Sequence, residues 1–220
     1  MSVLQTLVLA SASPRRLDLM MQAGIEPDRL LPTHIDETPH RAEHPRSLAR
    51  RLSLEKARAA LKIVKDEQTD ADRQAIKDGT MAMPHILAAD TVVARGSKVM
   101  PKADTVEDAT HCLRMLSGRT HRVYTGLAVI GPSGKTRQRI VETRVRFRRL
   151  PRSVIDSYIA SDEWRGKAGG YAIQGLAGTF VVKLVGSYTN VVGLPLAETV
   201  TLLGTERFDV YMNWHAGGAR

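Results

Sequence analysis

Near its start the chain reads Leu7-Val8-Leu9-Ala10-Ser11-Ala12-Ser13-Pro14-Arg15-Arg16. The apolar run from Thr6 to Ala10 is short and predicts a buried β-strand. Ser13 followed by Pro14 predicts a helix start, because serine is a favoured N-cap and proline fits the first helical position. A strand should therefore lead through a turn of small residues into a helix.

Two arginines, Arg15 and Arg16, occupy the first turn of this helix, where the helix dipole favours carboxylates. The hydroxyls of Ser11 and Ser13, the free backbone N–H groups and both guanidinium groups should converge on one point. Phosphate is the ligand that such a helix start binds. A surface helix with incidental arginines is the alternative that this stretch alone leaves open.

The composition limits the classes of protein to which the chain can belong. It has 220 residues, a formal net charge of +9, three Phe, five Tyr and two Trp. The charge favours a polyanionic partner, while the scarcity of aromatic residues argues against a surface on which bases stack. The single cysteine, Cys112, excludes an internal disulfide and is expected to be a buried core thiol. No apolar run approaches the roughly 18 residues of a membrane span, so we expect a cytoplasmic location without a membrane partner.

The remaining pattern mixes strands and helices along the whole chain. Residues 47–65 have apolar side chains at helical spacing, residues 86–94 form a second apolar run, and residues 123–147 predict a long hairpin. Residues 66–84 are polar without a clear period, which fits an exposed helix extension or a loop. This order predicts an α/β fold with a mixed sheet flanked by helices and two lobes around a cleft, in one domain over residues 1–220.

Asp90 is the most informative single residue, because it interrupts the apolar run 86–94. A carboxylate in such a strand is costly unless it is paired or functional, so we expect a metal ligand or a general base. A strand-end aspartate that caps a turn is the alternative. Asp36 and Glu37 follow another short strand, and beside Asp90 they could hold Mg²⁺ together with phosphates and water. The sequence pattern alone does not distinguish Lys56 and Lys102 from the other lysines as site residues.

A glycine-rich stretch runs from Gly166 to Gly175 and contains Lys167 and Gln174. Glycines allow a ligand to approach the backbone closely, and the amide of Gln174 could read the edge of a base. The spacing matches neither the P-loop nor the Rossmann fingerprint, so neither fold is supported.

Several of these motifs occur in one order over nearly the whole chain. They are Ser11-Ala12-Ser13-Pro14-Arg15-Arg16, Asp36-Glu37, Glu55-Lys56-Ala57-Arg58-Ala59, Ala89-Asp90-Thr91-Val92-Val93, Leu116-Ser117-Gly118, Gly166-Lys167-Ala168-Gly169-Gly170-Tyr171, Ile173-Gln174-Gly175 and Asn190-Val191-Val192-Gly193-Leu194-Pro195-Leu196. Together they resemble the Maf family of nucleoside triphosphate pyrophosphatases.

The resemblance implies an inosine triphosphate pyrophosphatase-like fold and hydrolysis of a nucleoside triphosphate to the monophosphate and pyrophosphate with a divalent metal, Mg²⁺ or Mn²⁺. By position, Asp90 corresponds to the catalytic carboxylate, and Arg15, Thr91 and Gln174 match positions associated with substrate choice. The pattern around Lys167 and Gln174 is similar to the branch that acts on dTTP and UTP.

We accordingly expect Glu37 and Asp90 to hold the metal, while Lys56, Lys102 and Arg15 neutralise the triphosphate. Ser11, Ser13, Arg16, Thr91, Lys167 and Gln174 complete the expected substrate site. Two alternatives stay open, a pyrophosphatase for modified nucleotides such as 7-methyl-GTP and a non-catalytic nucleic-acid-binding regulator. No stable nucleic-acid complex is expected, and a homodimer is possible.

Overall fold

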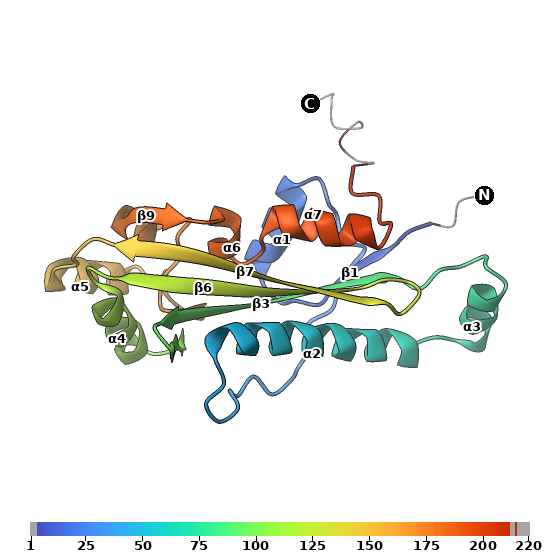
Figure 1. The fold of residues 1–220 in the computed structure, drawn as a ribbon, viewed down its shortest axis with the longest axis horizontal. Helices are drawn as coiled ribbons and strands as arrows, with labels where there is room; N and C mark the ends of the chain where they lie inside the picture. The colour runs from blue at the N-terminus through green and yellow to red at the C-terminus, as the bar shows by residue number, and fades with distance from the viewer. Residues whose placement is uncertain (1–3, 212–213, 215–220) are drawn as a thin grey trace.

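The computed structural model describes residues 4–211 and residue 214. In this part of the chain, seven strands form one mixed sheet with the order β2-β1-β3-β6-β7-β9, and β4 pairs with β3 (Figure 1). The strands are β1 (Leu7–Leu9), β2 (Arg29–Leu30), β3 (His85–Arg95), β4 (Lys98–Met100), β6 (Thr120–Ile130), β7 (Thr136–Phe147) and β9 (Val181–Val185). A separate two-stranded sheet joins β5 (Lys102–Ala103) to β8 (Lys167–Ala168).

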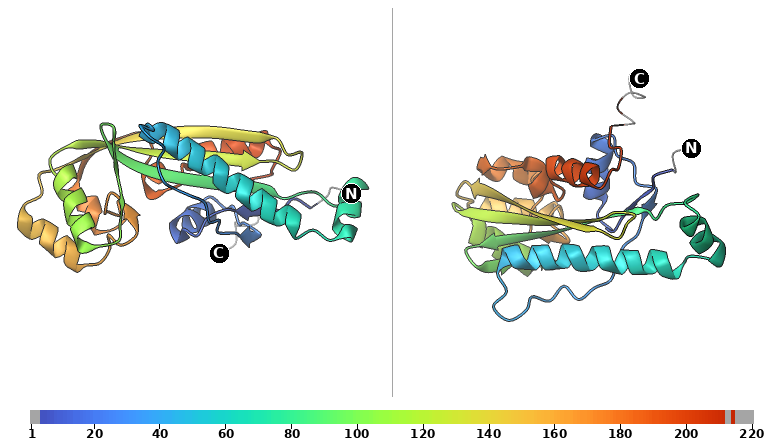
Figure 2. Two further views of the ribbon diagram at one scale, coloured as in Figure 1. Left: turned by 90° about the horizontal axis from the view of Figure 1, so that it is seen from below. Right: turned by 45° about the vertical axis from the view of Figure 1, so that its right-hand side comes forward.

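Helices cover both faces of the large sheet (Figure 1). One face carries α2 (Pro45–Asp66), and the opposite face carries α1 (Pro14–Gln22), α6 (Tyr188–Val192) and α7 (Leu196–Thr205). The helices α4 (Val106–Leu116) and α5 (Arg152–Ala160) lie at one end, close to the short 3₁₀ helix η1 (Leu176–Phe180). Figure 2 shows that α2 runs along the sheet and that α3 (Asp70–Lys77) lies beyond its end.

The core follows the two-residue period of the strands. In β3, Ala88 and Val92 belong to the clusters beneath α2, whereas Ala89 and Val93 belong to the larger cluster on the other face. The helix α2 lies so close to β6 that a Cβ atom at Gly126 would stand 2.1 Å from the carbonyl oxygen of Ala49. Glycine is therefore required at this crossing, and it lets α2 approach the middle of the sheet.

The expected mixed sheet flanked by helices is confirmed, and so are the first strand–turn–helix unit, the hairpin and the buried position of Cys112. Two local predictions differ from the structure. Residues 66–84 contain α3, which begins at a capping box between Thr69 and Asp72 rather than at an apolar face. Residues 190–193, where the sequence Asn-Val-Val-Gly predicts a turn, belong mostly to α6. That residues 1–220 form one domain stays a prediction.

Candidate active site

The candidate site lies in a gap of the large sheet. On one edge of β3, the strand β1 pairs only with residues His85 to Leu87, and the pairing with β4 begins only at Val93. Between these two neighbours the edge around Asp90 and Thr91 faces a cavity of about 700 Å³. Two chain segments close it, residues 10–16 and residues 165–174. The expected cleft is therefore present.

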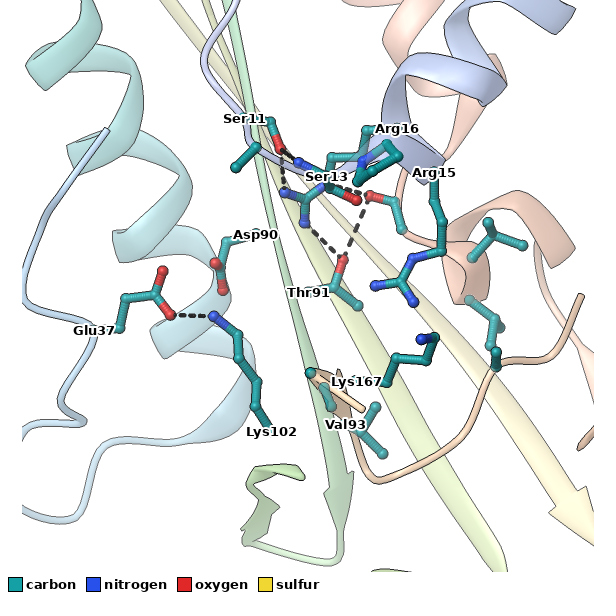
Figure 3. Close-up of a pocket in the computed structure, with 18 of the residues that line it drawn as sticks. Ser11, Ser13, Arg15, Arg16, Glu37, Asp90, Thr91, Val93, Lys102 and Lys167 are labelled. Atoms are coloured by element: carbon teal, nitrogen blue, oxygen red, sulfur yellow. Dashed lines mark hydrogen bonds and ion pairs between the residues drawn. The ribbon is translucent and has the colours of Figure 1, made fainter. Parts of the chain in front are cut away.

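Four charged side chains form the wall of this cavity on the α2 side. Lys56, from the middle of α2, places its Nζ 2.5 Å from Oδ1 of Asp90 and 2.7 Å from Oε1 of Glu37. Lys102 of β5 places its Nζ 2.6 Å from the other oxygen of Glu37 (Figure 3). We call these residues the carboxylate–lysine cluster. Asp90 and Lys56 are buried, so each needs the other to offset its lost hydration.

The acidity of Glu37 reflects this arrangement. Burial by itself would raise the pKa of the carboxyl, but the hydrogen bonds and charges of Lys102 and Lys56 outweigh burial and lower the pKa to about 2. Glu37 is therefore an anion at every physiological pH. The cluster has two carboxylates between two ammonium groups, and either carboxylate can exchange an ammonium partner for another cation.

The wall on the other side of β3 is held by Arg16. Its guanidinium donates to the carbonyl oxygen of Gly193 at 2.9 Å, to Oγ of Ser11 at 3.0 Å and to Oγ1 of Thr91 at 3.3 Å. Thr91 also contacts Oγ1 of Thr125 at 3.0 Å. One partly buried arginine thus links the serine turn, β3 and the loop after α6, as Figure 3 shows for Ser11 and Thr91.

Arg15 and Lys167 differ from Arg16, because their charged groups point toward each other across the cavity (Figure 3). Burial lowers the pKa of both, and the charge of Arg15 lowers the pKa of Lys167 further. Within the described part of the chain neither group pairs with a carboxylate. Two like charges that face each other in a part-buried cavity favour an anion between them.

All of the site residues expected from the sequence line this one cavity. They are Ser11, Ser13, Arg15, Arg16, Glu37, Lys56, Asp90, Thr91, Lys102, Lys167 and Gln174. The suggestion that Asp36 could share a metal with Glu37 is wrong for this arrangement, because its Oδ1 accepts a hydrogen bond from the backbone N–H of Thr38, 2.9 Å away, and Asp36 is absent from the cavity lining. The roles of the residues that do line the cavity stay predictions.

Sequence reasoning missed two residues beside the glycine-rich stretch. Arg165 lines the cavity and adds another cation next to Lys167. Glu163 stands behind the same stretch, and its carboxylate accepts hydrogen bonds from the backbone N–H groups of Leu176 and Ala177. Neither residue stands out in the sequence, because the glycine pattern begins only at Gly166.

Comparison with known proteins fits this geometry. A model of the family described as Maf-like protein matches residues 6–206. The chain belongs to the Maf-like family. It is 63% identical over 214 residues to a dTTP/UTP pyrophosphatase of Mesorhizobium japonicum, covering 97% of this chain and 98% of the relative. It is 60% identical over 217 residues to a dTTP/UTP pyrophosphatase of Brucella abortus, covering 99% of each chain.

Two solved structures that this Maf-like chain resembles are less similar to it in sequence than these relatives. A HAM1 protein from Coxiella burnetii is 18% identical with a TM-score of 0.41, covering 68% of this chain and 76% of that chain. A nucleoside-triphosphatase, dITP/XTP pyrophosphatase, from Mycobacterium abscessus is 16% identical with a TM-score of 0.39, covering 92% and 95%. Among the described residues, no helix of this Maf-like chain has both the length and the apolar character needed to cross a membrane.

Proposed function

We propose that this chain is a nucleoside triphosphate pyrophosphatase that hydrolyses dTTP and UTP to the monophosphate and pyrophosphate. One observation carries the proposal. A single cavity holds the carboxylate–lysine cluster on one side and the facing cations Arg15 and Lys167 on the other. The names of the relatives with 60% and 63% identity supply the two substrates.

The residues divide the work as follows. Arg15 and Lys167 bind phosphate oxygens, and an anion between them removes their mutual repulsion. Asp90 orients a water molecule against the α-phosphorus and accepts its proton. As the new P–O bond forms, the bond to the bridging oxygen breaks and pyrophosphate leaves. Lys56 and Lys102 stabilise the negative charge that develops on the phosphate oxygens.

The donor set also fits a divalent cation, Mg²⁺ or Mn²⁺. Glu37 and Asp90 both place a carboxylate oxygen within 2.7 Å of the Lys56 Nζ, so their oxygens already converge on one positive charge. Mg²⁺ typically takes one or two carboxylates together with substrate phosphates and water. When bound here, the ion would add charge stabilisation to the phosphates.

Pyrophosphate release from a panel of triphosphates in the presence of Mg²⁺ tests the proposal. We expect release from dTTP and UTP, and its loss in the Asp90→Asn variant. An exposed carboxylate on α5, Asp156, supplies the matched control, because Asp156→Asn removes one negative charge far from the cavity.

Two other outcomes of this experiment would favour a different substrate or a different function. Release only from 7-methyl-GTP or another modified nucleotide would keep the chemistry and contradict the assignment of substrates. No release from any triphosphate, together with DNA binding that falls steeply with salt, would favour a nucleic-acid-binding regulator.

A further inference from the structure

Gln174 lies at the tip of a tight turn. The turn is closed by a hydrogen bond from the backbone N–H of Gly175 to the carbonyl oxygen of Ala172, 3.1 Å away. Gln174 is exposed in the cavity, and its side-chain amide makes no hydrogen bond within the described part of the protein. The backbone of residues 172–177 therefore sets the position from which this side chain reaches into the cavity.

A partly buried carboxylate, that of Glu163, holds the C-terminal side of this turn. Oε2 of Glu163 accepts from the N–H of Leu176 at 2.8 Å, and Oε1 accepts from the N–H of Ala177 at 3.3 Å. These N–H groups open the 3₁₀ helix η1, where a carboxylate both satisfies free donors and complements the helix dipole. Glu163, which is not part of η1, thus caps the N-terminus of this helix.

A hydrogen-bond network of Glu163 and Tyr158 holds the N-terminal side of the turn. The hydroxyl of Tyr158 donates to Oε1 of Glu163 at 2.9 Å and accepts from the N–H of Ala172 at 3.2 Å. Tyr158 is buried, so this hydroxyl is shielded from water. A Cβ atom at Gly175 would stand 2.0 Å from Oε2 of Glu163, so glycine is needed for the carboxylate to approach this closely.

We propose that Glu163 is a positioning residue that fixes the amide of Gln174 toward the nucleobase and thereby sets the preference for pyrimidine over purine triphosphates. The inference rests on the function proposed above. Glu163 is absent from the cavity lining and forms no hydrogen bond with an expected substrate group. Its charge raises the pKa of Lys167, an effect on a phosphate-binding group that all triphosphates share, so selectivity between bases is expected to depend on the turn. The amide of glutamine pairs with the carbonyl and ring N–H of thymine or uracil, and this pairing depends on its direction.

The variant Glu163→Gln tests the network with little change of volume. Its amide offers one acceptor oxygen where the carboxylate has two, and its NH₂ group faces a backbone N–H donor. We expect kcat/KM for dTTP and UTP to fall about tenfold, since one directed hydrogen bond is lost. We expect kcat/KM for dGTP to stay within about twofold of the wild-type value, because Arg15, Lys167 and Asp90 keep their side chains and any effect of the lost charge on Lys167 is common to both substrates.

Two further variants keep the test independent of folding. Tyr158→Phe removes only the hydroxyl and should shift the dTTP-to-dGTP ratio in the same direction. Asp156 is exposed and lies two residues before Tyr158 on α5, so Asp156→Asn should leave the ratio unchanged. Thermal melts of each variant separate a loss of stability from a loss of selectivity.

A double-mutant cycle with Gln174→Ala decides whether Glu163 acts through Gln174. In the Gln174→Ala background, Glu163→Gln should no longer change the ratio of kcat/KM for dTTP to that for dGTP. Equal losses on dTTP and dGTP, or a full effect in both backgrounds, would overturn the inference and leave the proposed function intact. Absence of pyrophosphate release from the wild-type protein would overturn the proposed function and this inference together.

Discussion

The two walls of the cavity begin at consecutive residues of one strand and are built in opposite ways. Asp90 points to the α2 side and pairs with Lys56, whereas Thr91 points to the other side and contacts Arg16. Successive side chains of a strand point to opposite faces of the sheet, so the adjacent residues Asp90 and Thr91 contribute to opposite walls. The first wall balances its own charges, and the second leaves Arg15 and Lys167 facing each other.

This difference suggests a division of labour. A wall whose charges are already paired changes little when an anion enters, so it can hold reacting groups in place. A wall with two facing cations gains most when an anion binds, so it supplies binding energy.

The strongest contrast is between Asp90→Asn and Thr91→Val. Loss of a general base typically costs about 10²- to 10⁴-fold, so Asp90→Asn should lower kcat by that factor with a native circular dichroism spectrum. Thr91→Val keeps the shape on the other wall and should lower kcat by less than about tenfold. Steady-state kinetics with dTTP measures both. Near-normal rates for Asp90→Asn would contradict its catalytic role.

Lys56→Met tests whether the first wall balances its charges. Removing the ammonium leaves a buried carboxylate uncompensated, so the free energy of unfolding at pH 7 should fall by about 3–5 kcal/mol. Lys62→Met on the same helix is the control, because its pair with Asp66 is exposed to solvent and contributes little to stability. Urea denaturation measures both changes. Equal effects would show that the cluster does not stabilise the fold.

The buried His121 supports the cavity through its contact with Tyr171, a residue of the cavity lining. Its Nε2 lies 2.8 Å from the hydroxyl of Tyr171, and burial lowers the pKa of the imidazole from 6.5 to about 4. As the pH falls, the imidazole of His121 is protonated in the unfolded chain before it is protonated in the folded protein. The free energy of unfolding therefore falls as the pH drops from 6.5 to about 4, by about 3 kcal/mol in total. Urea denaturation over this range should show a shallower pH dependence for His121→Phe, while a control variant of the exposed His40 should follow the wild type.

The two neighbouring arginines should separate binding from architecture. Arg15→Ala removes a facing cation and should raise KM for dTTP about tenfold with little change in melting temperature. Arg16→Ala removes three structural hydrogen bonds and should lower the melting temperature by several degrees as well as the activity. Thermal melts beside kinetics distinguish them. A larger loss of stability for Arg15→Ala would reverse the assignment.

Much of this molecule follows from local pattern. The short apolar run before Ser11, the Ser13-Pro14 helix start and the long hairpin all have the predicted form. Asp90 stands out because a carboxylate in an apolar strand demands a partner, and the structure supplies Lys56. By contrast, α3 was missed because a capping box, not an apolar face, defines it.

Local sequence patterns specified most of the helices and strands, the buried carboxylate and, through the motifs, the family. Tertiary packing was needed to show which lysines pair with the carboxylates, which of two adjacent arginines is held by structural hydrogen bonds, and that Glu163 holds the turn of Gln174. The physical reason is distance along the chain. Lys56 meets Asp90 across 34 positions, and such a contact depends on how α2 packs on the sheet rather than on any local pattern.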